Sequence, residues 1–159
     1  MAVQLCVIKK HNVMENRINI QQVQPQAYKA MFALEAFLAG AIISKGHKHL
    51  LKIRASQING CAYCLNMHTK EALADGETAK RIFLLNAWKE SGLFSPQEEA
   101  ILALTEEITL IAGHGVSDAV YNRAAALFDE VYLSQLVMAI VTINAWNRIA
   151  ITTKTKLPD

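Results

Sequence analysis

Two observations in the sequence predict an all-α fold. Seven glycines and three prolines are few for 159 residues, which favours helices over a turn-rich β fold. Apolar residues recur at intervals of three and four along most of the chain, as they do on one face of a helix. No repeat, low-complexity block or linker interrupts this pattern. We therefore expect a single domain over residues 1–159, with a helical core over about residues 25–151.

In the first half of the chain, glycines mark the predicted ends of the helices. Residues 1–24 are predicted to be irregular, although QLCVI could form a short strand. A helix is predicted over residues 25–44, because its opening proline suits a first turn, and Gly46 is predicted to end it. The next helix contains the apolar residues between 50 and 58 and is broken by Asn59-Gly60.

The second half of the chain carries clear helix start signals. Ser95-Pro96 places an N-cap residue before a proline in the first turn, and Ser117-Asp118 offers a further cap. Leu84, Leu85 and Trp88 share one face and are predicted to point into the core. AGHGVSD, which contains His114, is predicted to be a loop. The helices expected in this half are residues 61–74, 77–91, 96–111, 118–128 and 129–151.

Charge and hydropathy argue against nucleic acid and membrane as partners. The net charge of +2 is small, and no run of lysine and arginine suggests a nucleic-acid surface. The longest apolar stretches, residues 36–43 and 136–143, are far shorter than the roughly 18 residues of a membrane span. The start MAVQLCVIKK does not resemble a secretion signal, so we expect a cytoplasmic protein. In that reducing compartment, paired cysteines are more often catalytic or metal-binding than structural.

The composition also predicts an oligomer. Hydrophobic residues make up 52% of the chain and charged residues only 19%, and a subunit interface is one place to bury the surplus. The helix predicted at residues 129–151 is apolar nearly all round, so it must be covered on more than one face by the core or by another subunit. Asn144 and Asn147 are polar on that helix, and we expect them to make buried hydrogen bonds. Trp88 and Trp146 are interpreted as core or interface aromatics.

The most informative stretch is NGCAYCLNMH, which contains Cys61, Cys64 and His68. At about 100° per residue around a helix axis, Cys64 is rotated by ~300° from Cys61. His68 is rotated by ~700° from Cys61, which brings it back to within ~20° of the direction of Cys61. All three side chains therefore share one stripe. Asn59-Gly60 places both sulfurs near a helix start, where free N–H groups and the helix dipole favour an anion. His68 follows Cys64 by one helical turn and can act as its base.

This arrangement suits thiol redox chemistry on a peroxide. A thiolate attacks the O–O bond of a hydroperoxide and becomes a sulfenic acid, and a neighbouring thiol condenses with it to a disulfide. The CxxC spacing allows that disulfide with little backbone movement. An external thiol or disulfide reductant must then restore the dithiol.

Three other interpretations of the cysteine pair remain open at this point. The cysteines could be buried and structural. They could bind zinc with His68 and a fourth ligand from His47, His49 or His114, although no second CxxC or HxxxH pair completes a familiar spacing. A thioredoxin-like fold would place the CxxC after a strand in a βαβ pattern, and none is visible.

The cysteine motif and its surroundings resemble a known family. SQINGCAYCLNMH at residues 56–68 is closely similar to the alkylhydroperoxidase D-like branch of the carboxymuconolactone decarboxylase family. LKIRA at residues 51–55 and INAWNR at residues 143–148 also look like that branch. The resemblance extends over roughly residues 25–151.

The resemblance implies an all-helical fold, assembly as homotrimers or homohexamers, and reduction of hydroperoxides without a metal or organic cofactor. It implies that Cys64 attacks the peroxide, that Cys61 resolves the sulfenic acid, and that His68 helps to deprotonate the attacking sulfur. The rival activity in the wider family is decarboxylation of a γ-lactone acid, in which a CxxC pair has no evident role.

This chain departs from the family pattern at two positions. The pattern has a relay glutamate twelve residues before the first cysteine, where this chain has His49. A histidine can take a proton-relay role, so His49 is a candidate catalytic residue with an altered pH profile. The pattern often has a histidine between the cysteines, where this chain has Tyr63. A tyrosine hydroxyl can donate a hydrogen bond but is a poor base near neutral pH.

Overall fold

The computed structural model describes residues 17–158, and every regular element in that range is a helix, as the sequence predicts. Cys6, which we interpret as a free thiol, and the possible strand at QLCVI lie outside the described residues. The elements in chain order are α1 (Ile20–Val23), α2 (Pro25–Ala39), α3 (Lys45–Asn59), α4 (Ala62–Ala74), α5 (Ala79–Leu84), the 3₁₀ helix η1 (Leu85–Ala87), α6 (Trp88–Ser91), α7 (Pro96–Thr109), α8 (Ile111–His114), α9 (Asp118–Ala125) and α10 (Glu130–Thr153).

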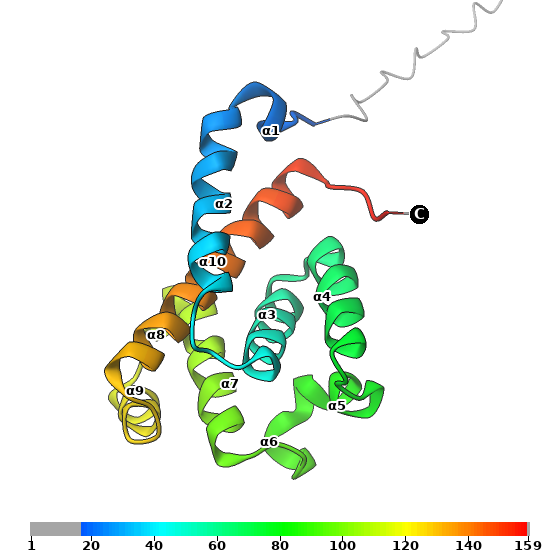
Figure 1. The fold of residues 1–159 in the computed structure, drawn as a ribbon. Coiled ribbons are helices and arrows are strands. Elements are labelled where there is room, and N and C mark those ends of the chain that lie inside the picture. Colours follow the sequence, from blue (N-terminus) through cyan, green and yellow to red (C-terminus); the bar gives the residue numbers. More distant parts are fainter. Residues whose placement is uncertain (1–16, 159) are drawn as a thin grey trace, which may run out of the picture.

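The long helices α3, α7 and α10 form the centre of the fold. Helix α3 packs against α4, α7 and α10, while α10 also contacts α2 and α9. In Figure 1, α3 lies between α2 and α10 on one side and α4 on the other, and the short helices α5 and α6 close the lower end. This arrangement makes α3 the element that holds α4 against the rest of the molecule.

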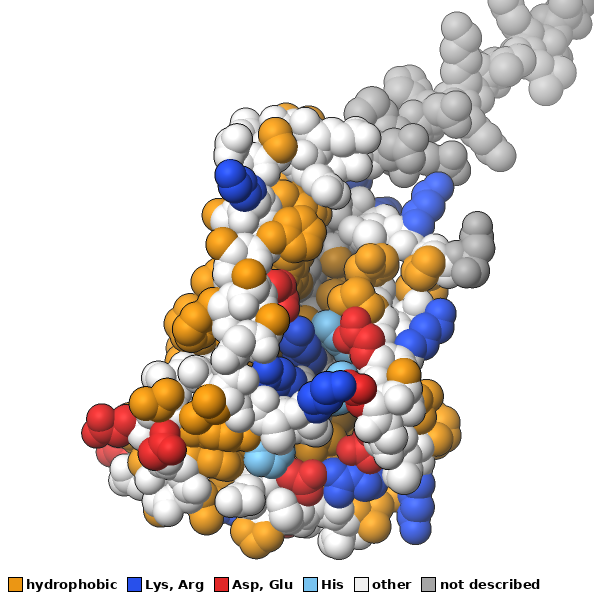
Figure 2. All heavy atoms as spheres, in the orientation of Figure 1, with side chains coloured by type: hydrophobic (Ala, Val, Ile, Leu, Met, Phe, Trp, Pro, Cys, Tyr) orange, Lys and Arg blue, Asp and Glu red, His pale blue; other side chains and the backbone are white. Residues whose placement is uncertain are grey.

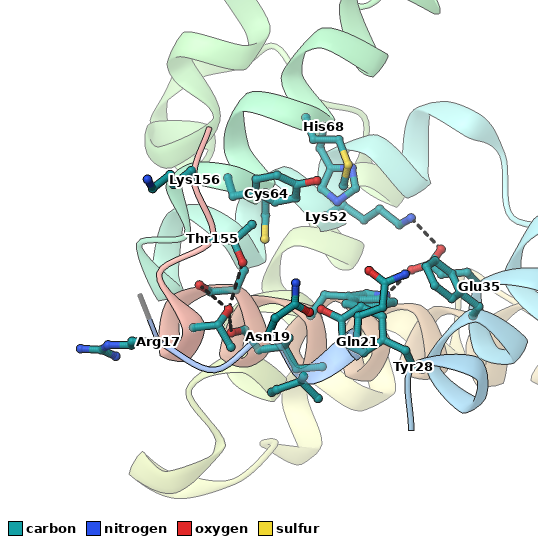
Figure 3. Close-up of a pocket in the computed structure, with 18 of the residues that line it drawn as sticks. Arg17, Asn19, Gln21, Tyr28, Glu35, Lys52, Cys64, His68, Thr155 and Lys156 are labelled. Atoms are coloured by element: carbon teal, nitrogen blue, oxygen red, sulfur yellow. Dashed lines mark hydrogen bonds and ion pairs between the residues drawn. The ribbon is translucent and has the colours of Figure 1, made fainter. Parts of the chain in front are cut away.

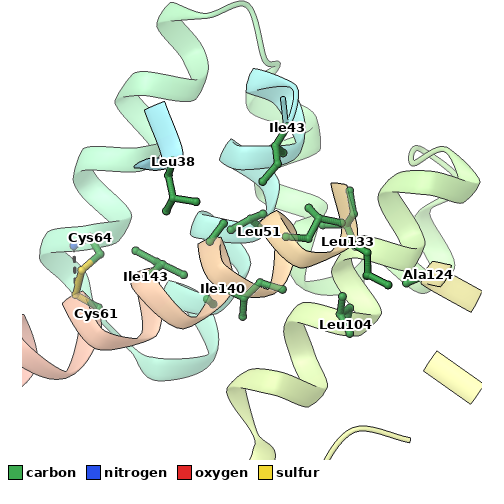
Figure 4. Close-up of a cluster of buried hydrophobic side chains, with 14 residues drawn as sticks. Leu38, Ile43, Leu51, Cys61, Cys64, Leu104, Ala124, Leu133, Ile140 and Ile143 are labelled. Carbon is green, nitrogen blue, oxygen red and sulfur yellow. Dashed lines mark hydrogen bonds between the residues drawn. A yellow bond between two sulfur atoms is a disulfide. The ribbon is translucent and has the colours of Figure 1, made fainter. Parts of the chain in front are cut away.

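Helix α3 is buried on two faces. Leu51 and Ala55 belong to the larger hydrophobic cluster, while Leu50 and Ile53 belong to a smaller one that also contains Trp88. Both cysteines of the CxxC motif lie at the edge of the larger cluster (Figure 4). The buried members of the larger cluster are Leu38, Ile43, Leu51, Ala55, Cys61, Cys64, Ile101, Leu104, Ala124, Leu133, Leu136, Ala139, Ile140 and Ile143.

Helix α10 is 24 residues long and apolar enough to pass a length-and-composition test for a membrane span. The sequence-based estimate of an eight-residue apolar stretch was therefore too short for this element. The same test is met by the core helix of a soluble protein, so it is weak evidence for a membrane. Leu136, Ile140 and Ile143 are fully or almost fully buried against the other helices, which is how a core helix packs.

A left-handed turn at Gly60 joins α3 to α4. Gly60 has a φ of 70°, where a side chain would be strained, and its N–H donates to the carbonyl of Gln57. The next N–H, of Cys61, donates to the carbonyl of Ser56 at 3.0 Å. These two bonds form a Schellman motif, which satisfies the last carbonyls of α3 and directs the chain into α4.

Two of the expected helices have other boundaries in the structure, and local capping explains the first of them. The helix expected over residues 25–44 ends at Ala39, and Ser44 instead caps α3 by accepting the N–H of His47. Gly46 consequently lies in the first turn of α3 rather than after a helix. The helix expected over residues 77–91 is divided into α5, η1 and α6.

Other expectations for the second half had mixed outcomes. Ser95 and Glu98 form a reciprocal capping box at the start of α7, which confirms that start signal. Leu84 is 37% exposed, so its predicted inward orientation was wrong, whereas Leu85 is buried. Part of the loop predicted around AGHGVSD is the short helix α8, which ends at an exposed His114.

An amide network fixes the end of α3 to α10. The side-chain N–H₂ of Asn59 donates to Asn144 Oδ1 at 2.9 Å and to Asn147 Oδ1 at 2.8 Å. Asn147 is fully buried and donates in turn to Ser56 Oγ at 3.1 Å, while Asn144 donates to Thr109 Oγ1. The buried hydrogen bonds expected for the two asparagines of α10 are therefore confirmed, and they anchor the turn that precedes Cys61.

We predict that Asn147→Leu lowers the free energy of unfolding by about 2 kcal/mol, because it removes the acceptor of an Asn59 N–H and the donor to Ser56. Chemical denaturation of the oxidised protein measures the change. The matched control is Asn122→Leu on the exposed face of α9, which should change stability by less than about 0.5 kcal/mol. Equal effects of the two substitutions would contradict a structural role for the network.

Candidate active site

The CxxC motif occupies the start of α4. Cys61 is the N-cap residue, and its Sγ accepts the backbone N–H of Cys64 at 3.3 Å. Cys64 lies within the first turn, where unpaired N–H groups and the helix dipole favour negative charge. The two sulfurs are joined in a disulfide, and the Cα atoms are 5.4 Å apart. The structure therefore describes the oxidised form of the pair.

The two cysteines differ in their access to a cavity. Both are almost fully buried, with exposed fractions of 1% for Cys61 and 2% for Cys64. Cys64 lines a cavity of about 580 Å³, whereas Cys61 is not among the residues that line it. Figure 2 shows basic, acidic and histidine side chains gathered in the hollow between α2 and α4. A small molecule that enters this cavity meets the sulfur of Cys64.

His68 lies on the same wall of the cavity as Cys64. Its Nδ1 is 2.8 Å from Glu71 Oε2, and because a carboxylate can only accept, Nδ1 carries the proton of this hydrogen bond. Nε2 has no hydrogen-bond partner among residues 17–158, so its lone pair is available in the neutral ring. Burial lowers the pKa of His68 from its ordinary 6.5, and the hydrogen bond that His68 donates to Glu71 partly offsets that shift. The ring is accordingly neutral at pH 7 and can accept a proton.

The structure brings three of the four predicted site residues together and leaves the fourth apart. Cys61, Cys64 and His68 all lie at the start or on the inner face of α4, as the helical spacing predicts. His49 does not line the cavity that contains Cys64. Its Nε2 is instead 2.8 Å from Asp75 Oδ2, beside a separate cavity of about 230 Å³.

The partner of His49 terminates α4. Asp75 follows the last residue of that helix, and hydrogen bonds from Lys45, first, and from His49, second, lower the pKa of its carboxyl group. The contacts of His49 thus tie the beginning of α3 to the end of α4. A relay role for His49 stays a prediction.

Three side chains that the sequence interpretation missed meet in the cavity. Lys52 Nζ on α3 is 3.2 Å from Glu35 Oε2 on α2, and Trp146 Nε1 on α10 donates to Glu35 Oε1 at 3.0 Å. All three line the cavity that Cys64 and His68 also line, and Figure 3 shows Lys52 and Glu35 there. Lys52 and Glu35 each interrupt an otherwise apolar stretch, which is the signal that could have singled them out.

Aromatic rings form part of the cavity wall. Tyr28 packs edge to face against Trp146 with ring centroids 5.5 Å apart, and Phe32 contacts both rings. Trp146 is therefore a cavity residue, while Trp88 is buried in the smaller hydrophobic cluster as expected. Tyr63, between the two cysteines, also lines the cavity. An apolar organic group fits this wall better than a highly charged one.

The histidines considered as zinc ligands are not gathered around the sulfurs. His47 Nδ1 is 2.7 Å from the hydroxyl of Tyr132, His49 contacts Asp75, and His114 is exposed at the end of α8. Over the part of the chain that is described, no group of three or more histidine, cysteine or acidic side chains is placed to hold a metal ion.

Comparison with known proteins places the chain in a family. Residues 25–107 match the carboxymuconolactone decarboxylase family. The chain is also 42% identical over 138 residues to the uncharacterised protein YdfG of Bacillus subtilis (strain 168), a match that covers 87% of this chain and 94% of YdfG.

Solved structures support the same assignment. ATU0492 of Agrobacterium tumefaciens, a protein of unknown function provisionally assigned as the antioxidant defence protein AhpD, is 37% identical with a TM-score of 0.87, over 91% of this chain and 99% of that one. A peroxidase-related protein from Silicibacter sp. TM1040 shares the fold alone, with 18% identity and a TM-score of 0.71 over 86% of this chain and 80% of that one. The helical fold, the CxxC pair and these matches together show that the chain belongs to the carboxymuconolactone decarboxylase family and has the AhpD-like fold.

Proposed function

We propose that the protein is a thiol-dependent peroxidase, which reduces organic hydroperoxides through a cycle between the Cys61–Cys64 dithiol and its disulfide. One observation carries the proposal: the cavity lined by Cys64 is also lined by His68, whose Nε2 has no hydrogen-bond partner among residues 17–158, and Cys61 is joined to Cys64 by a disulfide. The resolving thiol and the base thus each lie about one helical turn from the nucleophile, on opposite sides of it along the chain.

The first half-reaction takes place in the reduced protein. His68 Nε2 accepts the proton of the Cys64 thiol, and the thiolate attacks the terminal oxygen of the hydroperoxide. The S–O bond forms as the O–O bond breaks, and the leaving alkoxide takes the proton back from His68. The products are a sulfenic acid on Cys64 and an alcohol, so the peroxide is reduced by two electrons and the sulfur is oxidised by two.

The second half-reaction forms the Cys61–Cys64 disulfide. The Cys61 thiol attacks the sulfenic sulfur of Cys64, the S–S bond forms, and the hydroxyl leaves as water with the proton of Cys61. The Cys64 N–H that contacts Cys61 Sγ favours the thiolate needed for this step. A dithiol reductant then exchanges with the disulfide, which suits a reducing compartment such as the cytoplasm.

The contacts of His68 suggest that Glu71 orients the base. The hydrogen bond from Nδ1 fixes the tautomer whose Nε2 can accept a proton, and it stabilises the imidazolium that forms in the first step. Glu71 would thus do what a relay glutamate does in the family pattern, from a position three residues after His68 on the same helix.

Two further expectations belong to this proposal. Assembly as a homotrimer or homohexamer would cover part of the apolar surface, which includes half-exposed Phe32, Phe37 and Val141. Decarboxylation of a γ-lactone acid remains the rival activity, because the family name includes it. We place decarboxylation second because that reaction has no evident role for the CxxC pair.

The cysteine cycle is tested by thiol counting. One equivalent of an organic hydroperoxide should remove two thiols from the reduced protein, with a Cys61–Cys64 link found by mass spectrometry. Cys64→Ser should abolish peroxide consumption. Cys61→Ser should allow one turnover and leave a sulfenic acid that a dimedone-type reagent traps. Survival of both thiols in the wild-type protein would refute the proposed function, and lactone turnover that persists in Cys64→Ser would favour the decarboxylase.

The pH profile tests His68 and its partner. Because the pKa of His68 lies below 6.5 and only the neutral ring accepts a proton, the rate of peroxide reaction should be level near pH 7 and fall as the pH drops through that lowered pKa. His68→Gln should slow the reaction by about 100-fold or more. Glu71→Gln should move the acid limb to lower pH, since the Glu71 hydrogen bond raises the pKa of His68. Stopped-flow measurement of thiol loss gives the profiles.

His49→Gln decides between the two relay candidates in the same assay. A relay through His49 predicts a slower reaction with an altered pH profile in His49→Gln. A relay through Glu71 predicts those changes in Glu71→Gln alone. The contacts of His49 with Asp75, outside the cavity, favour the second result.

A further inference from the structure

The peroxidase cycle leaves a partly buried ion pair of the cavity without a task. Lys52, Glu35 and Trp146 come from three different helices and form a linked group that lines the cavity. The side chain of Lys52 is only 17% exposed and that of Glu35 is 30% exposed. Because partial burial of an ammonium group costs free energy even when it is paired, a cation that faces a reaction cavity is a candidate for a role in the chemistry.

The ammonium group has hydrogen-bonding capacity to spare. An ammonium carries three N–H donors, and Glu35 is the one hydrogen-bond acceptor of Lys52 Nζ among residues 17–158. Lys48, one turn earlier on α3, differs in this respect because its Nζ donates to the carbonyls of Leu38 and Ala41. Lys52 can therefore donate to a molecule in the cavity without breaking its bond to Glu35.

The pair also lies close to the reacting groups. The positive charge of Lys52 lowers the pKa of His68 and the negative charge of Glu35 raises it, so both charges act on the imidazole. Figure 3 shows the Lys52 side chain passing beside His68 towards Glu35, with Cys64 on the same cavity. A molecule in this cavity can therefore meet Cys64, His68 and Lys52 together.

The peroxidase reaction has a requirement that the cysteines and His68 do not meet by themselves. As the O–O bond breaks, negative charge develops on the oxygen that leaves as an alkoxide, before that oxygen receives its proton. A fixed donor aimed at such a developing charge accelerates reactions strongly in a site that excludes water. The ammonium group of Lys52 is a donor of this kind, and it keeps its own proton throughout.

We infer that Lys52 is a catalytic residue that hydrogen-bonds the leaving oxygen of an alkyl hydroperoxide, and that Glu35, held by Trp146, positions it. The inference rests on the proposed peroxidase function. The step balances without further reagents: Cys64 supplies the electron pair, His68 returns the proton of the thiol to the alkoxide, and Lys52 lowers the barrier electrostatically.

The test compares two oxidants that differ in their leaving groups. An alkyl hydroperoxide such as tert-butyl hydroperoxide releases a strongly basic alkoxide, whereas an aromatic peracid releases a weakly basic carboxylate that needs little stabilisation. Stopped-flow thiol loss is followed in the reduced protein, at a pH below the pKa of the peracid so that both oxidants are uncharged. Lys52→Met should lower the rate of thiol loss to the alkyl hydroperoxide by about 100-fold and change the rate of thiol loss to the peracid only slightly.

Matched variants separate chemistry from structure. Lys52→Arg retains the cation and should recover part of the alkyl hydroperoxide rate. Glu35→Gln should lower the rate with the alkyl hydroperoxide by a smaller factor and again leave the rate with the peracid nearly unchanged, because Lys52 loses its ion-pair partner. Lys48→Met removes a partly buried lysine from the same helix outside the cavity and should affect both oxidants alike.

Equal slowing of both oxidants by Lys52→Met would overturn the inference, because a structural loss does not distinguish leaving groups. An unchanged rate with both would overturn it as well. Either result leaves the peroxidase proposal in place, provided that the wild-type protein loses its two thiols to both oxidants. If the wild-type protein reacts with neither, the proposed function fails and this inference fails with it.

Discussion

The site depends on one short junction, the turn from α3 into α4 at Gly60. The Schellman bonds end α3 at a defined residue, and the Asn59 amide bonds that end to α10. Because the turn is fixed on both sides, Cys61 becomes the N-cap residue of α4 and Cys64 falls within its first turn. The electrostatic setting of the sulfurs is thus a consequence of backbone geometry.

A second consequence concerns access. Both cysteines belong to the larger hydrophobic cluster, but only Cys64 is among the residues that line the cavity. In the proposed cycle, oxidant and reductant would therefore reach the same sulfur through the same cavity. In that cycle, this geometry would protect Cys61 from direct oxidation. It also means that the groups lining this one cavity can influence both halves of the cycle.

The polar groups around Cys64 come from different parts of the fold. The imidazole of His68 and the carboxylate of Glu71 belong to α4, so their spacing is fixed by one helix. Lys52 and Glu35 meet across the interface of α3 and α2, and their position depends on how those helices pack. The residue at position 49 is instead used to join α3 to the end of α4. The hydrogen-bond partner of His68 is accordingly a residue of the same helix.

The sequence by itself determined what short-range geometry controls. Helical periodicity predicted that Cys61, Cys64 and His68 share a stripe, and the serine before Pro96 predicted the start of α7. The cap at Ser44 was not predicted, which is why the helix expected over 25–44 ends earlier, and the division of the helix expected over 77–91 was not predicted either.

Only the tertiary structure decided which polar groups join the cysteines. Glu35 is 17 residues from Lys52 and 111 from Trp146, and no periodicity in the chain relates them. The same holds for His49, whose side chain is turned towards Asp75, 26 residues later. The single-domain boundaries and the oligomer stay predictions. Helical spacing acts over a few residues, whereas the lining of a cavity is set by the packing of whole helices, which follows from the burial of apolar faces all along the chain.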